Sequence, residues 1–262
     1  MQNQDKQISV IMPALNEEKN IIPAIDSVVT AFGKYNLRGE IIVINDGSAD
    51  STSDLVKSKV SQAGSCEIRL IDHDKPQGVG ASFWEGAGMA KSDAVVMLPG
   101  DNENDPGEIF RYYKLLEDVD IVIPFVYNKQ ARNILRNLLS SVYIFIINFT
   151  FSINLHYANG TVLYRRSILK DLKSRESGFF FQTDILVKLI KNGYLFSEVP
   201  YKLIGRKKGI SKALKPSSLI CVAGGYFRLI KDCLITGYAK LGDFAPDSRT
   251  AHRRLPDKGG QG

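Results

Sequence analysis

The feature that most constrains this chain is an alternation of short apolar runs with segments of helix length. The runs at 8–12 and 40–46 are rich in isoleucine, and residues Pro13 and Gly47 follow them. Between the runs, apolar residues recur at helical spacing over 17–32. Two strands connected by a helix indicate a βαβ unit, in which the strands pair in parallel.

The alternation continues along the chain. We expect further strands at 68–72, 94–98 and 121–126, and helices at 52–63 and 80–90. This pattern predicts an α/β fold, with a mostly parallel sheet and helices on both faces. Because ligands of such sheets bind beyond the carboxyl ends of the strands, the loops at that edge form the candidate site.

Composition narrows the class of protein. The 262 residues are 44% hydrophobic and 24% charged, which excludes a disordered chain and a collagen-like fibre. Cys66, Cys221 and Cys233 lie far apart and form no CxxC motif, so neither a zinc knuckle nor a disulfide framework is indicated. The N-terminal residues lack the features of a signal peptide, and we therefore expect a reducing compartment.

Charge is unevenly distributed. The formal net charge is +6, but acidic residues dominate the first 120 positions and basic residues dominate the remainder. The basic part favours an anionic partner, which could be nucleic acid, a membrane surface or a phosphorylated substrate. Nucleic acid is disfavoured because no basic groups are interleaved with the aromatic residues of 137–155.

Two apolar segments lie in the second half. Residues 137–164 contain no Asp, Glu, Lys or Arg, and an amphipathic helix is predicted over about 131–155. Periodicity alone leaves two alternatives open, a helix lying along a membrane interface or a core helix docked on the sheet. A second amphipathic helix is expected over 217–235, whereas 243–262 has the composition of a loosely ordered tail.

The densest chemical signal is DNEND at 101–105, directly after the strand at 94–98. Its three carboxylates, Asp101, Glu103 and Asp105, could turn their oxygens onto one divalent cation. An EF-hand is excluded because its required glycine and glutamate are absent. The alternative is that Asp105 caps the helix that begins near Pro106.

Two more loops open at the same predicted edge, at 13–18 and 46–52. Carboxylates at Glu17, Asp46 and Asp101 could therefore converge on one crevice and accept hydrogen bonds from a nucleoside. Each loop also has an alternative as a helix cap, through Asn16 and Glu17 in one and Ser48 and Asp50 in the other.

The motifs together resemble the family 2 glycosyltransferases of GT-A fold, in the branch of the dolichyl-phosphate mannose synthases and polyprenyl-phosphate glycosyltransferases. The resemblance rests on VIMPALNE at 10–17, VINDGSADST at 43–52, GVGASFWEGA at 78–87 and PGDNE at 99–103. It continues with NG at 159–160, FFFQTD at 179–184, EVPY at 198–201 and RKKGISK at 206–212.

The resemblance implies a role for each matching position. Mg²⁺ or Mn²⁺ would be held by Asp101, Glu103 and Asp105, and the lipid phosphate by Arg132 and Arg136. The residues implied in catalysis are Asp101, Asp184, Arg206 and Lys212. The residues implied in binding the nucleotide sugar are Pro13, Ala14, Leu15, Asn16, Glu17, Asp46, Gly47, Ser48, Gly78, Asp101, Asn102, Gln182, Arg206, Ser211 and Lys212.

The resemblance also implies the reaction, an inverting, metal-dependent transfer of a hexose from a GDP- or UDP-sugar to a polyprenyl or dolichyl phosphate. Three positions depart from the family pattern: Glu103 replaces an Asp, His156 replaces an Asp, and Val162 replaces an Arg. Two alternatives remain, a transferase that acts on a hydroxyl with Asp184 as base, and a non-catalytic membrane scaffold of the same fold.

The implied location is the cytoplasmic face of a membrane, where the protein would be monotopic or would need a separate membrane-protein partner. The expected organisation is a catalytic domain at 1–212, a membrane-associating helical segment at 213–242 and a tail at 243–262.

The residues themselves predict structural roles for several glycines and histidines. Gly78 and Gly80 lack the third glycine of a dinucleotide fingerprint, and we interpret them as permitting a loop to approach the donor closely. Gly86 is expected to serve helix packing. The spacing of His73, His156 and His252 does not suit a metal site, so each is expected to have a generic polar or core role.

Overall fold

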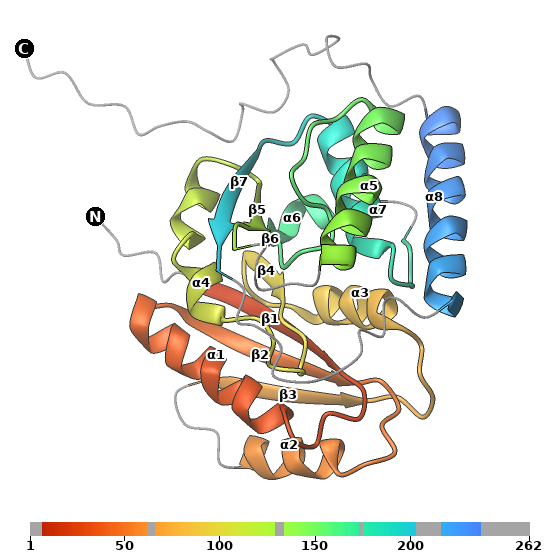
Figure 1. Cartoon of the computed structure of the whole chain (residues 1–262). Coiled ribbons are helices and arrows are strands. Elements are labelled where there is room, and N and C mark those ends of the chain that lie inside the picture. The colour runs from red at the N-terminus through yellow and green to blue at the C-terminus, as the bar shows by residue number, and fades with distance from the viewer. Residues whose placement is uncertain (1–6, 62–65, 129–133, 173–174, 203–215, 237–262) are drawn as a thin grey trace, which may run out of the picture.

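The computed structural model describes residues 7–61, 66–128, 134–172, 175–202 and 216–236. Its centre is a seven-stranded sheet with the order β3-β2-β1-β4-β6-β5-β7 (Figure 1). The strands are β1 (Gln7–Ala14), β2 (Arg38–Asn45), β3 (Glu67–Asp72), β4 (Ala94–Met97), β5 (Ile121–Val126), β6 (Leu163–Arg165) and β7 (Phe196–Tyr201). Neighbouring strands pair in parallel except at β6, which is antiparallel to both β4 and β5.

Helices connect the strands and cover both faces of the sheet. They are α1 (Ile21–Tyr35), α2 (Thr52–Ser61), α3 (Val79–Met89), α4 (Pro106–Phe110), the 3₁₀ helix η1 (Tyr113–Glu117), α5 (Ile134–Phe151), α6 (Arg166–Leu169), α7 (Phe181–Lys191) and α8 (Pro216–Thr236). The predicted α/β class and the mostly parallel sheet are therefore confirmed.

Side chains that alternate along each strand form two hydrophobic cores. On β1, Val10 and Met12 face a core shared with α1, α2 and α4, while Ile11 faces the core on the other side. That second core contains buried residues of α3, α5, α7 and α8. Figure 1 shows α5, α7 and α8 side by side on this second face. The position of Gly86 agrees with its expected packing role, because a Cβ there would lie 2.6 Å from Ile11 Cγ2.

Some element boundaries differ from the sequence predictions for identifiable reasons. Helix α1 begins at residue 21 and not at 17, because residues 16–18 form hydrogen bonds with the loop at 48–52. Helix α5 ends at Phe151, before Ser152 adopts a left-handed φ of 50°. The three-residue strand β6 was not predicted, because such a short antiparallel strand has no periodicity of its own.

The structure shows that α5 combines features of both predicted alternatives. Its inner side packs on the core through buried Ile147 and Phe151. Its outer side exposes apolar residues, among them Phe145 at 68% and Phe149 at 80%. In the part of the chain that the structure describes, no helix is both long and apolar enough to cross a bilayer.

Candidate active site

The loops after β2 and β4 both attach to the end of β1. The Asp46 amide donates to the Ala14 carbonyl at 2.8 Å, and the Gly100 amide donates to the Pro13 carbonyl at 2.9 Å. Because these strands run in parallel, their carboxyl ends lie at one edge, and the bonds place the segments bearing Asp46 and Asp101 on either side of residues 13–14. The adjacency of these loops, predicted from the sequence, is present.

The loop after β1 is joined side by side to the loop after β2. Asn16 adopts a φ of 57°, which lets its amide donate to Ser48 Oγ at 2.9 Å while its Oδ1 accepts from the Ala49 amide at 2.8 Å. The Glu17 amide donates to Thr52 Oγ1 at 2.9 Å. Asn16 is therefore not the cap of α1, whose N-cap residue is Asn20, and the capping alternative for Asn16 was wrong.

Asp50 does serve the start of α2. Its Oδ1 accepts from the Thr52 amide at 3.0 Å, and its Oδ2 accepts from the Glu18 amide at 3.1 Å. Hydrogen bonds from Thr52 and Glu18 outweigh desolvation and lower the pKa of Asp50. Asp50 thus joins the two loops through a carboxylate that stays ionised at neutral pH.

Asp46 is buried, and its carboxylate organises the turn that precedes α3. Oδ1 accepts from the Gln77 amide at 2.7 Å, and Oδ2 accepts from the Gly78 amide at 3.0 Å. His73 Nδ1 lies 2.8 Å from Asp46 Oδ1, and His73 Nε2 lies 2.6 Å from Glu85 Oε2. In this structure Asp46 therefore shapes the predicted nucleotide crevice through the backbone it holds.

The contacts of His73 with Asp46 and Glu85 were missed by the sequence analysis, which gave His73 only a generic role. The available signal was its position directly after β3, at the same edge as the other candidate loops. Burial lowers the pKa of His73, but hydrogen bonds and charge from Asp46 and Glu85 raise it by more, so the net shift is upward. The protonated ring can donate to both carboxylates, which links their positions.

This network predicts a pH-dependent contribution to stability. Because the pKa of His73 is raised in the folded protein, protonation of His73 stabilises the fold. This stabilisation is complete below the pKa that histidine has in the unfolded chain, about 6.5, and it is lost as the pH rises through the pKa of His73 in the folded protein. His73→Gln should cost about 1.5–3 kcal/mol at pH 6, the value of hydrogen bonds to charged groups. The difference between the two proteins should narrow at alkaline pH, as measured by urea unfolding across the pH range.

A second substitution checks that the carboxylates cause the effect. Glu85→Gln removes one of the two groups that raise the pKa of His73, so the pH at which stability declines should move lower. Parallel stability profiles for wild type and His73→Gln at every pH would contradict the assignment.

The acidic loop after β4 has its own local order. Asn102 has a left-handed φ of 55°, and the Glu103 amide donates to Asp101 Oδ1 at 3.1 Å. Asp105 caps α4, since its Oδ1 accepts from the Gly107 amide at 2.7 Å. The capping alternative for Asp105 is thus confirmed, and a metal-binding role for Asp105 stays a prediction.

A metal at this loop would be coordinated mainly by Asp101 and Glu103. Within the described ranges, the structure forms no group of three or more His, Cys, Asp or Glu side chains placed to hold an ion. Mg²⁺ commonly binds one or two carboxylates and takes its other ligands from substrate phosphates and water. The chemistry of the two carboxylates fits a cation of that kind, brought with a diphosphate.

Helix α7 carries two further predicted residues, Gln182 and Asp184. Gln182 is buried, and its Nε2 donates to the Tyr164 hydroxyl. Asp184 is 4% exposed and pairs with Lys188, whose Nζ lies 2.7 Å from Asp184 Oδ1. Desolvation outweighs the attraction of Lys188 and raises the pKa of Asp184 to about 6. The roles predicted for these residues near the sugar stay predictions.

Gly78 and Gly80 allow a close approach, but the backbone that approaches is that of Ser177. A Cβ on Gly78 would lie 2.9 Å from the Ser177 carbonyl oxygen, and a Cβ on Gly80 would lie 2.6 Å from the Ser177 carbonyl carbon. Gly78 also has a φ of 101°, which side-chain-bearing residues rarely adopt. The glycines thus permit packing between two protein loops, and their expected approach to the donor stays a prediction.

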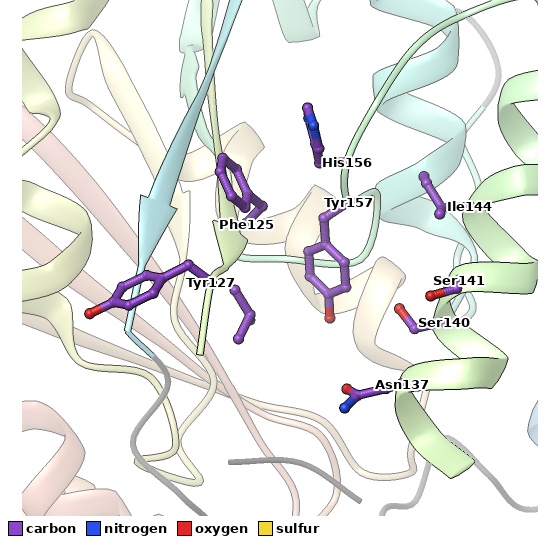
Figure 2. A pocket seen from close by; sticks show the side chains of 9 residues that line it. Phe125, Tyr127, Asn137, Ser140, Ser141, Ile144, His156 and Tyr157 are labelled. Carbon is purple, nitrogen blue, oxygen red and sulfur yellow. The ribbon is translucent and has the colours of Figure 1, made fainter. Parts of the chain in front are cut away.

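A cavity of about 290 Å³ opens beside the carboxyl end of β5. In Figure 2 the ring of Tyr157 lies between side chains from the β5 end and those from α5. Among the side chains that the structure describes, the lining includes no Asp, Glu, Lys or Arg and consists of Phe125, Val126, Tyr127, Asn137, Ser140, Ser141, Ile144, His156 and Tyr157. His156 is fixed there by Glu198, whose Oε2 lies 2.7 Å from His156 Nδ1.

The residues of the predicted phosphate-binding segments lie outside the part of the chain that the structure describes, either wholly or in their side chains. Arg132, Arg206, Ser211 and Lys212 lie outside the described residues. Arg136 lies within α5, but its side chain is also outside the description. Their predicted roles stay predictions.

Comparisons with known proteins place the chain in a family. The model of glycosyl transferase family 2 matches residues 9–173, which is more than half of the chain. The chain therefore belongs to glycosyl transferase family 2.

Curated relatives support one branch of that family. The chain is 28% identical to dodecaprenyl-phosphate galacturonate synthase of Rhizobium johnstonii, over 65% of this chain and 51% of the relative. It is 29% identical to undecaprenyl-phosphate 4-deoxy-4-formamido-L-arabinose transferase of Serratia proteamaculans, over 48% of this chain and 38% of the relative. The chain thus spans only about half or less of these relatives' lengths.

Solved structures agree in fold. Glucosyl-3-phosphoglycerate synthase of Mycobacterium tuberculosis, in complex with UDP, superposes with a TM-score of 0.63 at 19% identity. The match covers 90% of this chain and 82% of that one. The same enzyme has been crystallised with Mn²⁺, UDP and phosphoglyceric acid, with a TM-score of 0.60. At this identity the likeness establishes the GT-A type fold alone.

Proposed function

We propose that this chain transfers a hexose from a GDP- or UDP-sugar to a polyprenyl or dolichyl phosphate at a membrane surface. The observation that carries the proposal is the attachment of the Asp46 and Asp101 loops to the end of β1. This arrangement can present a nucleoside pocket beside a pair of carboxylates suited to a diphosphate-bound cation. The named relatives, which act on dodecaprenyl and undecaprenyl phosphates, support the same acceptor class.

The proposed donor site uses the chain's own loops for positioning. Asp101 and Glu103 would hold Mg²⁺ or Mn²⁺, which supplies charge that stabilises the departing diphosphate. The crystallisation of a structural neighbour with Mn²⁺ and UDP supports this cofactor class. Asp46 would act by fixing the Gln77–Gly78 turn, whose amides donate to its carboxylate. Arg206 and Lys212, which lie outside the described residues, are proposed to add positive charge near the phosphates.

The proposed phosphate acceptor does not need a strong general base from the protein. A phosphate oxygen is already anionic near neutral pH, so the main tasks are alignment with the anomeric carbon and exclusion of water. Asp184 is paired with Lys188, which favours a positioning role over that of a base for a hydroxyl acceptor. We place the acceptor's phosphate end near the cavity beside the first turns of α5, where Arg132 and Arg136 are proposed to bind it.

A donor screen tests this function. The chain is incubated with common GDP- and UDP-sugars and Mg²⁺ or Mn²⁺, with and without a polyprenyl phosphate, and release of nucleoside diphosphate is measured. We expect metal-dependent release that the polyprenyl phosphate stimulates. Release without such stimulation would favour a hydroxyl acceptor, and no release from any donor would contradict an active transferase.

Membrane association is proposed to use the outer side of α5. Replacing Phe145 or Phe149 by Glu should weaken binding to anionic vesicles by about tenfold or more each, because burying an exposed Phe contributes about 1.5–3 kcal/mol. Both side chains are largely exposed, so thermal stability should change little. Sedimentation with vesicles, combined with thermal unfolding, checks the prediction.

Two control substitutions separate membrane contact from folding. Val60→Glu introduces the same charge at an exposed apolar residue of α2 and should leave vesicle binding unchanged. Ile147→Glu places a charge on the buried side of α5 and should destabilise the fold strongly. Unchanged vesicle binding by the Phe145 and Phe149 variants would remove α5 from the membrane contact.

A further inference from the structure

Helix α8 is packed on the catalytic fold by its inner side. Leu229 is fully buried, and a Cβ on Gly225 would lie 2.8 Å from Phe180 Cβ, so the backbones of α8 and the start of α7 are close. The Tyr226 hydroxyl lies 2.7 Å from Thr150 Oγ1 of α5. The position of α8 is thus set by contacts with both α5 and α7.

One ion pair connects α8 to a loop outside these helices. Arg228 Nη1 contacts Glu176 Oε2, and the Glu176 side chain is 9% exposed. Glu176 Oε1 accepts from the Gly178 amide at 3.1 Å, and its backbone carbonyl accepts from Trp84 Nε1 at 3.2 Å. Arg228 therefore holds a carboxylate that fixes the turn at 176–178, and the backbone carbonyl of the same residue attaches this turn to α3.

The same turn abuts the start of α3. The Ala81 amide donates to the Ser177 carbonyl at 3.1 Å, and the absence of side chains at Gly78 and Gly80 brings this carbonyl into contact with their backbone. The Gly78 amide in turn donates to Asp46 Oδ2 at 3.0 Å. A continuous series of contacts thus runs from Arg228 to the loop that Asp46 organises.

We propose that Arg228 is a positioning residue for the donor site: by holding Glu176, it keeps the 176–178 turn pressed against the Gly78–Gly80 backbone and so fixes the crevice beside Asp46. The importance of this crevice for the donor rests on the proposed function. This role gives α8 a part in donor binding. The helix also has an exposed apolar side, which includes Phe227, Leu234 and Ile235.

Hydrogen exchange of the protein alone tests the connection without any nucleotide. In Arg228→Gln, the amides of Gly78 and Ala81 should exchange about tenfold faster. The reason is that their acceptors, Asp46 Oδ2 and the Ser177 carbonyl, would no longer be held in place. Arg228→Lys, which keeps the charge, should restore part of the protection. Unchanged exchange at these two amides in Arg228→Gln would overturn the proposal.

Two controls address general loosening of α8. Lys231→Gln removes an exposed charge from the same helix and should leave the two amides protected. Asp232→Asn alters a different α8 contact, the one with Lys188 at 3.1 Å, without touching Glu176. If Asp232→Asn accelerated exchange at Gly78 and Ala81 as much as Arg228→Gln does, the Arg228–Glu176 pair would not be the specific link.

Binding of GDP and UDP with Mn²⁺, measured by calorimetry, completes the test. Arg228→Gln should weaken nucleotide binding by about five- to tenfold, a typical size for coupling between sites. In turnover, the same variant should raise the donor KM more than it lowers kcat. If the wild type bound neither nucleotide, the proposed function would fail. If the wild type and Arg228→Gln bound the nucleotide with the same affinity, the positioning role alone would fail.

Discussion

Replacing Asp101 by Asn should lower metal-dependent release of nucleoside diphosphate by about 100-fold or more, the effect of losing a major electrostatic stabiliser of the transition state. The substitution keeps the shape of the side chain and an oxygen that can accept the Glu103 amide, so the loop should stay folded. What it removes is the negative charge with which the loop would attract the cation. Steady-state rates over a series of Mg²⁺ and Mn²⁺ concentrations measure the loss.

A matched carboxylate provides the control. Asp54→Asn changes an exposed residue of α2 whose side chain is 86% accessible, and it should leave the rate unchanged. Excess metal should recover part of the activity of Asp101→Asn if the defect lies in cation binding. A rate within about twofold of wild type for Asp101→Asn would remove this residue from the proposed metal site, since such a change is only a few tenths of a kcal/mol.

Replacing Lys188 by Met should destabilise the fold by about 3–5 kcal/mol, because it leaves the buried carboxylate of Asp184 without its cation. Lys188 is 2% exposed at its side chain and lies 2.7 Å from Asp184 and 3.1 Å from Asp232. It therefore joins α7 to α8, and water has little access to the Lys188–Asp184 pair, whereas the Asp232 side chain is 23% exposed. Urea unfolding at pH 7 measures the change in the free energy of unfolding.

Lys191→Met is the matched control, since this residue lies one turn further along α7 at a less buried position. It should change the free energy of unfolding by no more than about 0.5 kcal/mol, as surface substitutions usually do. Adding Asp184→Asn to Lys188→Met should recover part of the stability, because it removes one of the two stranded charges. A loss below about 1 kcal/mol for Lys188→Met would contradict a central role for this ion cluster.

The fold could be predicted from the sequence to the extent that each element carries its own periodicity. The apolar runs that became β1 and β2, and the helical spacing that became α1, are local signals, and the structure confirms them. Strand β6 has three residues and depends on β4 and β5 for its definition, so no local signal could have identified it. The start of α1 was misplaced because contacts with a distant loop, centred on Ser48, compete with the helix.

The candidate site divides in the same way. The positions of Asp46 and Asp101 at one edge follow from parallel strand order, which the alternation of elements predicted. What these carboxylates do in the folded chain did not follow. The Asp46 carboxylate accepts two backbone amides and lies within hydrogen-bonding distance of His73, and Asp105 caps a helix, because unpaired amides at turns and helix starts need acceptors.

By itself, the sequence determined the class of fold, the edge at which a ligand can bind and the residue types available there. Each of these depends on periodicity or on short motifs, which act within a few residues. Only the tertiary structure decided that Ser177 packs on Gly78, that Lys188 joins α7 to α8, and that Arg228 reaches Glu176. These contacts join segments far apart in the chain, and they form only when packing of the apolar core brings their backbones together.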